Sequence, residues 1–175
     1  MAATRTSRSR GQRNAPAGIR WDQAQLAPIV LIRAGEEVLA DRAVSSLLAQ
    51  AKAKDPTTEV TRLEAATYEP HQLDTLVSPS LFGEPRLVYI PALEQMTDAL
   101  LADLLAYVGA ADPEVSVIPR HNSGQRGKRL LEAIKASPYP TIQCDAIKNA
   151  KDKSSLVVAD VRRAGRSIAP EAVGA

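Results

Sequence analysis

Gly35 stands where a nucleotide-binding loop would begin, between an apolar stretch and a helical pattern. A phosphate-binding loop needs Gly, any four residues and then Gly-Lys-Ser/Thr, because backbone amides wrap the phosphates and the lysine neutralises their charge. Counted from Gly35, that triplet falls on Ala40, Asp41 and Arg42, so a carboxylate occupies the lysine position. Two glutamates directly after Gly35 add negative charge. We therefore predict a degenerate loop at Gly35, Asp41 and Arg42 that binds no nucleotide.

A second glycine-lysine pair, Gly127 and Lys128, fails the same test. The first glycine of the motif would be Asn122, and Arg129 stands at the hydroxyl position. A carboxylate that could hold magnesium is also missing after the apolar stretch 86–90, where Pro-Ala-Leu follows. We find no paired nucleophile and base, and therefore expect no catalytic residue, no cofactor and no enzymatic activity from the chain's own chemistry.

The cysteine and the histidines give little support for a metal or redox site. Cys144 is the single cysteine, so the sequence shown can form no internal disulfide, which agrees with a reducing compartment. It ends an apolar strand pattern, and a buried structural thiol is expected there. His71 and His121 stand far apart without the spacing of metal ligands. No metal site is predicted.

Leu81 and Phe82 form an apolar pair inside residues 78–85, a segment dominated by turn-forming residues. Phe82 is the only phenylalanine. Loops run over the surface, so two large apolar side chains there either fold back into the core or face a partner. Taken without further information, the core interpretation is favoured, because such side chains are usually buried.

The apolar periodicity alternates between strands and helices. Strands are predicted at 28–33, 58–63, 86–90, 115–118 and 140–144, and helices at 36–54, 70–77, 98–108, 125–136 and 148–164. Pro119 is expected to close the fourth strand. Residues 168–173 look like the start of a further helix. The alternation predicts an α/β fold with a mostly parallel sheet flanked by helices.

Composition agrees with a globular protein outside the membrane. The chain has 175 residues, of which 45% are hydrophobic and 24% charged, which suits one core. No apolar run approaches the roughly 20 residues that a membrane helix needs. With no apolar signal-peptide core, a cytoplasmic location is expected. Residues 1–20 hold five arginines and no acid. We predict that residues 1–25 are a disordered basic tail.

Three segments carry a resemblance to a known family. They are PIVLIRAGEE at 28–37, SPSLFGEPRLVYI at 78–90 and GKRLLEAI at 127–134. Together they resemble the N-terminal part of the delta subunit of the bacterial DNA polymerase III clamp loader, and the tail and alanine content resemble its actinobacterial branch. The resemblance covers roughly residues 26–175, and Ser-Leu-Phe-Gly is its most specific part.

The resemblance implies an AAA+-like, degenerate P-loop NTPase domain at 26–146 that binds the sliding clamp. It also implies that 147–175 begin a helical lid domain, which is truncated here. Family members bind the ring-shaped clamp, the beta subunit, with a hydrophobic wedge and help to open it. The residues matching the clamp-binding segment are Ser80, Leu81, Phe82 and Gly83, with Leu81 and Phe82 as the wedge. This favours an interface over the core for that pair.

The resemblance also implies partners and a process. In the full-length protein these are the clamp-loader ATPase (gamma/tau) and delta-prime subunits, and DNA within the complex. Members of the family are subunits of the DNA polymerase III holoenzyme, a nucleotidyltransferase complex that acts in DNA replication. The resemblance implies no ATPase site in the delta subunit itself. The sequence departs from the family at Pro119, which interrupts a strand that usually runs longer.

A different class of function stays open. The basic tail, the lysines of residues 147–175 and the cluster Arg126, Lys128 and Arg129 could form a nucleic-acid-binding α/β module by phosphate neutralisation. Such charges are also common on a solvated helix face. Salt-dependent affinity for DNA would support the module, and salt-insensitive binding to a clamp would support the wedge.

Overall fold

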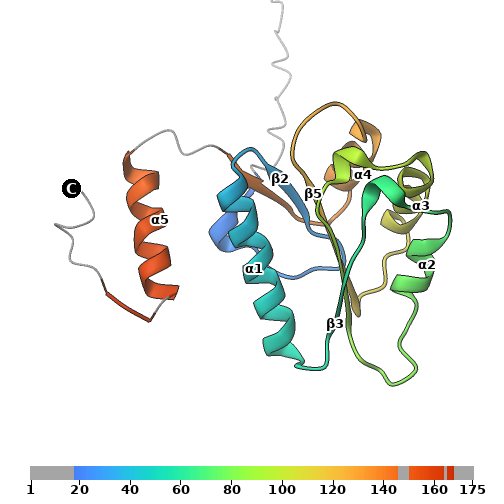
Figure 1. The fold of residues 1–175 in the computed structure, drawn as a ribbon, viewed down its shortest axis with the longest axis horizontal. Coiled ribbons are helices and arrows are strands. Elements are labelled where there is room, and N and C mark those ends of the chain that lie inside the picture. The colour runs from blue at the N-terminus through green and yellow to red at the C-terminus, as the bar shows by residue number, and fades with distance from the viewer. Residues whose placement is uncertain (1–17, 146–149, 164, 168–175) are drawn as a thin grey trace, which may run out of the picture.

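The computed structural model describes residues 18–145, 150–163 and 165–167. Within these residues, six strands form one sheet in the order β1-β6-β2-β5-β4-β3, and all neighbouring strands are parallel (Figure 1). The strands are β1 (Ile19–Arg20), β2 (Leu31–Ala34), β3 (Glu59–Arg62), β4 (Arg86–Ile90), β5 (Val115–His121) and β6 (Thr141–Cys144). The predicted α/β class with a parallel sheet is confirmed.

Helices cover both faces of the sheet (Figure 1). The α-helices are α1 (Glu37–Lys54), α2 (Gln72–Val77), α3 (Asp98–Val108), α4 (Lys128–Ala136) and α5 (Ala150–Arg163), and the short 3-10 helices are η1 (Trp21–Gln23), η2 (Ala65–Thr67) and η3 (Leu93–Gln95). One core cluster joins α1 and η1 to one face, and the other joins α2, α3 and α4 to the opposite face.

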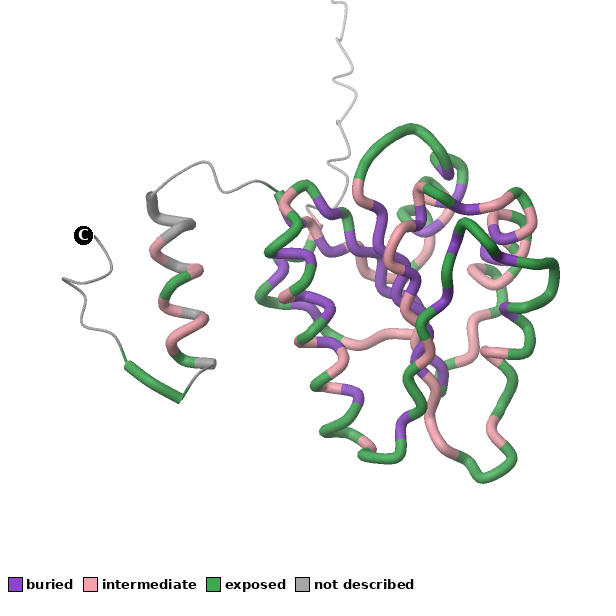
Figure 2. Tube along the Cα trace, viewed as in Figure 1, coloured by how far each residue is buried: buried purple, intermediate pink, exposed green. Residues whose placement is uncertain are grey.

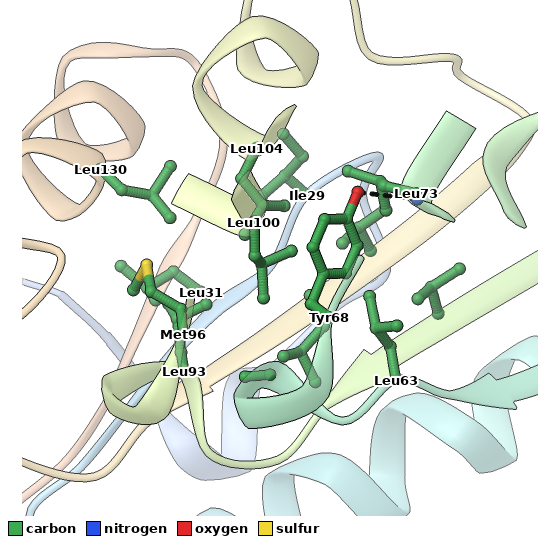
Figure 3. Packing of buried hydrophobic residues seen from close by; sticks show 14 of the residues in the cluster. Ile29, Leu31, Leu63, Tyr68, Leu73, Leu93, Met96, Leu100, Leu104 and Leu130 are labelled. Atoms are coloured by element: carbon green, nitrogen blue, oxygen red, sulfur yellow. Dashed lines mark hydrogen bonds between the residues drawn. The ribbon is translucent and has the colours of Figure 1, made fainter. Parts of the chain in front are cut away.

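The alternation of side chains along the strands builds these two layers. In β4, Val88 and Ile90 belong to the α2–α4 side, whereas Leu87 belongs to the α1 side. Figure 2 shows the buried residues concentrated along the strands and the inner faces of the helices. Figure 3 shows the α2–α4 core, where Leu73 of α2 and Leu100 of α3 lie near Tyr68. The sheet is thus a rigid platform buried on both faces.

The prediction that Pro119 closes the fourth strand is wrong, because β5 continues beyond it to the end of Val115–His121. Its pairing with β4 is continuous, with Ile90 opposite Pro119. On the other side, Val117 accepts a hydrogen bond from the Val30 amide at 2.9 Å, so Pro119 faces the same strand and has no N–H to donate. The pairing with β2 is interrupted there and resumes at Arg120.

The helix expected from residue 125 begins later, at Lys128. Gly127 adopts a left-handed conformation with φ of 78°, which stops the helix from extending backwards. A side chain at Gly127 would also place its Cβ 2.3 Å from the Met96 methyl carbon. The sequence pattern of basic and apolar residues does not reveal this constraint, because it comes from the backbone and from a distant neighbour.

The prediction of a disordered tail through residue 25 is wrong for the part that the structure describes. β1 (Ile19–Arg20) pairs with β6, and Trp21 is 9% exposed in the α1-side core. The Arg42 guanidinium lies 5.9 Å from the Trp21 ring centroid, a cation–π contact. The low average hydrophobicity of residues 1–25 predicts disorder, but one large side chain, Trp21, packs in the core. Residues 1–17 lie outside the described part.

α5 lies on the α1 side of the sheet, where Leu156 packs against the core cluster and Asp160 forms an ion pair with Arg42. The helix agrees with the predicted stretch 148–164, although residues 146–149 and 164 are outside the description. The expected helix start at 168–173 is outside it too. That α5 begins a lid domain stays a prediction. In the part of the chain that the structure describes, no helix is long and apolar enough to span a membrane.

Candidate functional site

Leu81 and Phe82 are the most exposed large apolar side chains among the described residues, with 98% and 88% of their surface accessible. The other exposed large apolar residues of the described chain, such as Val38 and Val60, are 49% and 43% exposed. The core interpretation of this pair is therefore wrong. Both side chains stand in solvent in the loop between α2 and β4.

A hydrogen-bonded turn presents the pair. The Gly83 amide donates to the Ser80 carbonyl at 3.3 Å, which puts Leu81 and Phe82 at the two central positions. The Ser80 Oγ accepts from the Phe82 amide at 3.2 Å and donates to the Glu84 carboxylate. Both side chains therefore occupy the corner of the turn, where both are exposed. Residues 80–83 are the predicted clamp-binding segment, and Glu84 was not among the predicted residues.

Arg86 ties the two ends of the loop together. Its Nη1 donates to the carbonyls of Ser78 at 2.6 Å and Thr75 at 3.2 Å, at the end of α2. Its Nε lies 3.3 Å from Glu59 Oε2 on the edge strand β3. Arg86 could not be predicted from the sequence, because nothing in the spacing shows that the first side chain of β4 reaches back to α2.

A second network holds the beginning of α2. Asp103 Oδ2 on α3 accepts from the Tyr68 hydroxyl at 2.5 Å and from the His71 amide at 2.9 Å. The Tyr68 hydroxyl also accepts from the Leu73 amide at 2.8 Å, the bond drawn in Figure 3. The hydrogen bond from Tyr68 lowers the pKa of Asp103, and burial raises the pKa of Tyr68. α2 is thus fixed at both ends.

The turn between β2 and α1, where a phosphate loop would lie, is short. Only Gly35 and Glu36 separate the strand from the helix. The Glu36 amide donates to the Cys144 carbonyl at 2.6 Å, and a Cβ on Gly35 would lie 3.1 Å from that same carbonyl. The Glu36 amide is therefore bonded to β6, whereas a phosphate cradle would need free amides.

The carboxylate at the expected lysine position has a protein partner. Asp41 Oδ1 lies 2.5 Å from Arg120 Nη1, and Glu37 Oε1 lies 3.6 Å from Arg120 Nη2. The Arg120 side chain is only 9% exposed. These residues line an open hollow of about 410 Å³ between α1 and the ends of β3, β4 and β5. Arg42 faces Asp160 and Trp21 instead of this hollow.

Cys144 is fully buried, as expected of a structural thiol. Burial raises its pKa to about 12, so the thiolate that nucleophilic chemistry requires is scarce at neutral pH. His121 is also buried, and its Nε2 lies 3.1 Å from the Arg126 carbonyl. In the described ranges, no group of three or more His, Cys, Asp or Glu side chains could hold a metal ion.

The basic cluster of the alternative function is partly engaged within the protein. Arg126 lies 2.9 Å from Asp98 and donates to the Met96 carbonyl at 2.6 Å. Lys128 lies 4.0 Å from Glu132 on the same helix. These contacts reduce the charge that the cluster can offer to phosphates. The tail arginines before residue 18 lie outside the described residues.

Comparison with known proteins identifies the fold. The α/β fold, with its parallel sheet between two layers of helices, is shared with part of a solved clamp-loader protein. The DNA clamp loader delta protein YqeN of Bacillus subtilis superposes with a TM-score of 0.59 at 18% identity, covering 85% of this chain and 47% of that one. Our chain therefore spans less than half the length of that protein. No protein-family model matches the sequence, and no curated protein sequence matches it significantly.

Two weaker structural matches come from Thermotoga maritima. A RuvB structure has a TM-score of 0.48 at 12% identity, covering 83% of this chain and 47% of that one. A DNA polymerase III gamma subunit-related protein has a TM-score of 0.47 at 12% identity, covering 84% of this chain and 52% of that one. At such identities, structural likeness defines the fold, and the function has to be argued from the site.

Proposed function

We propose that this chain is the N-terminal, clamp-binding part of a clamp-loader delta subunit. In this proposal Leu81 and Phe82 are a hydrophobic wedge that enters an apolar pocket of the sliding clamp, and Ser80 and Gly83 shape the turn that carries it. The observation that carries the proposal is the exposure of this pair, 98% and 88%, at the corner of a hydrogen-bonded turn. The sequence resemblance and the AAA+-like fold support it.

The wedge provides binding energy in a form that suits ring opening. Burying a Leu and a Phe side chain contributes about 1.5–3 kcal/mol each before the costs of association. To help open a ring, the wedge must bind the strained clamp more tightly than the closed clamp, because equal affinity shifts no equilibrium. The chain supplies this binding surface and no chemical step.

We assign the other functions of the family to the full-length protein within its complex. These are assembly with the gamma/tau ATPase and delta-prime subunits, contact with DNA, and action in replication as part of the DNA polymerase III holoenzyme. The short turn at Gly35 and the Asp41–Arg120 ion pair support a subunit that leaves ATP hydrolysis to its partners. The engaged contacts of Arg126 and Lys128 make the nucleic-acid-binding alternative the weaker one.

Calorimetric titration against the sliding clamp of the same organism tests the proposal. Replacing Leu81 and Phe82 with Ala should lower the binding free energy by about 2 kcal/mol or more per anchor. The melting temperature should stay within the small range expected of surface substitutions. The matched control replaces Val38 and Val60, which are 49% and 43% exposed on other elements, with Ala.

Wild-type affinity in the Leu81/Phe82 variant would remove the wedge from the mechanism. A large loss of thermal stability in that variant would show that the pair supports the fold. Absence of clamp binding by the wild-type chain itself, together with salt-dependent DNA binding, would favour the nucleic-acid-binding module.

A further inference from the structure

Among the described residues, nothing covers the tip of the loop 78–85, which is formed by residues 81–83. Leu81 and Phe82 are exposed, and a Cβ placed on Gly83 would meet nothing within 4 Å. The bonds inside the turn, between Ser80 and Gly83 and between Ser80 and Phe82, fix its internal shape only. The direction in which the turn points must therefore be set where the loop joins α2 and β4.

Arg86 occupies this junction. Its backbone is fixed in the sheet, because it is paired with Glu59 of β3 on one side and Val115 of β5 on the other. Its side chain is 24% exposed and extends back to the end of α2, where Nη1 contacts the carbonyls of Ser78 at 2.6 Å and Thr75 at 3.2 Å. One guanidinium therefore connects the start of the loop to its end.

The chemistry of the contact suits arginine. The last carbonyls of a helix lack intrahelical partners, and a positive charge beside them is favourable. The planar guanidinium donates from Nη1 to two carbonyls, and its Nε lies 3.3 Å from Glu59 Oε2 as an ion pair without a hydrogen bond. We infer that Arg86 is the positioning residue of the wedge turn: it sets the orientation of Leu81 and Phe82 relative to the sheet.

This inference deepens the proposed function and rests on it for its consequence in binding. A loop that samples many directions spends only a fraction of its time in the one that fits a partner. The apparent dissociation constant rises in inverse proportion to that fraction. Loss of Arg86 should therefore weaken binding although Arg86 itself need not touch the clamp.

The first experiment needs no partner. Chymotrypsin cleavage after Leu81 and Phe82, mapped by mass spectrometry, reports how often the loop opens, because native-state cleavage follows the open population. Arg86→Met should raise the cleavage rate about tenfold. Arg86→Lys keeps the positive charge but lacks the planar guanidinium, so its cleavage rate should lie between those of Arg86→Met and the wild type. The matched control is Arg62→Met on β3, whose side chain is 63% exposed and pairs with Glu64 at 2.7 Å.

Two outcomes overturn the inference. One is equal cleavage in Arg86→Met, Arg62→Met and the wild type. The other is faster cleavage at core sites as well as at Phe82, together with a large fall in melting temperature. That result would show a general structural role. If Arg86→Met does not fold, the Arg86→Lys variant decides: loop cleavage equal to that of the wild type contradicts the positioning role, and faster loop cleavage with an unchanged core supports it.

The second experiment adds the purified sliding clamp. The apparent affinity of Arg86→Met should fall about tenfold, mainly through a slower association rate, with Arg62→Met unchanged. Wild-type affinity in Arg86→Met would overturn the inference for binding. If the wild-type chain itself does not bind the clamp, the proposed function fails, and the cleavage experiment still decides whether Arg86 positions the loop.

Discussion

At the scale of single residues, a hydrogen-bonded turn exposes two large apolar side chains. Leu81 and Phe82 occupy the central positions between Ser80 and Gly83, so both point away from the sheet. Because the turn is already formed, a partner that binds it does not have to order these backbone positions, and less binding energy is lost as entropy. The shape of the turn should therefore matter as much as its apolar surface.

Gly83 tests this point, because its φ of 78° is a left-handed conformation that costs other residues about 1–2 kcal/mol. A side chain there has open space, so Gly83→Ala should strain only the backbone. We expect clamp affinity to fall by about tenfold, the equivalent of about 1.4 kcal/mol, in the same calorimetric titration.

Gly124 provides the control for Gly83. Its φ of 97° is also left-handed, and a Cβ there would likewise meet nothing within 4 Å, but it lies in the loop before α4. Gly124→Ala should produce a similar loss of stability with unchanged clamp affinity. If the two variants bind the clamp equally well, the turn geometry does not contribute to binding.

At the scale of elements, α2 leads into the loop that exposes Leu81 and Phe82. A helix as short as Gln72–Val77 is not stable alone in water, so its position depends on contacts at its ends. The Asp103 carboxylate on α3 holds the first end through Tyr68 and the His71 amide, and Arg86 on β4 holds the last. Two elements that are distant in sequence therefore determine where one short helix lies.

This arrangement predicts a pH-dependent contribution from Asp103. The Tyr68 hydroxyl bond lowers its folded-state pKa below the ordinary 3.8, so the stabilisation is fully present above about pH 4 and is lost as the pH falls through the folded-state pKa. In urea unfolding at pH 7, Asp103→Asn should lower the free energy of unfolding by about 1 kcal/mol, because charged hydrogen bonds become neutral ones. The difference from the wild type should shrink towards pH 3.

Asp98→Asn is the matched control on the same helix, because the Asp98 side chain is 95% exposed. At pH 7, the free energy of unfolding of Asp98→Asn should differ less from that of the wild type than the value for Asp103→Asn does. A loss of stability in Asp103→Asn that is the same at pH 3 and pH 7 would contradict an ionised Asp103 in the network.

The elements also show what sequence can and cannot predict. β4 and α3 were predicted with their observed bounds, because their apolar periodicity is regular from end to end. The end of β5 was missed, since Pro119 faces only one of its two neighbouring strands. At the site, Ser80–Gly83 could be found from composition and resemblance. Arg86 and Asp103 could not, because their role depends on contacts made only after folding.

At the scale of the whole molecule, the short strand-to-helix junction at Gly35 bears on whether the domain can bind ATP. We expect no magnesium-dependent ATP binding at micromolar concentrations and no ATP hydrolysis. Asp41→Lys should not create either activity, because the short turn still provides no phosphate cradle. It should also destabilise the fold, because a lysine would face the nearly buried Arg120.

A nucleotide titration monitored by calorimetry, with a phosphate-release assay, checks this expectation. The wild-type chain and the Asp41→Lys variant should give the same flat response. Saturable micromolar binding by the wild type would contradict the interpretation of the junction and would reopen an enzymatic function.

The strand order has a consequence for how the domain is made. β1, β2 and β3 leave the ribosome first, yet none of them is a neighbour of another in the sheet: β3 pairs with β4, β2 lies between β5 and β6, and β1 pairs with β6. At about 5–20 residues per second, β2 is synthesised on the order of ten seconds before β5. During translation, its apolar edge therefore stays unpaired, and the nascent chain is open to aggregation or chaperone capture until its C-terminal strands emerge.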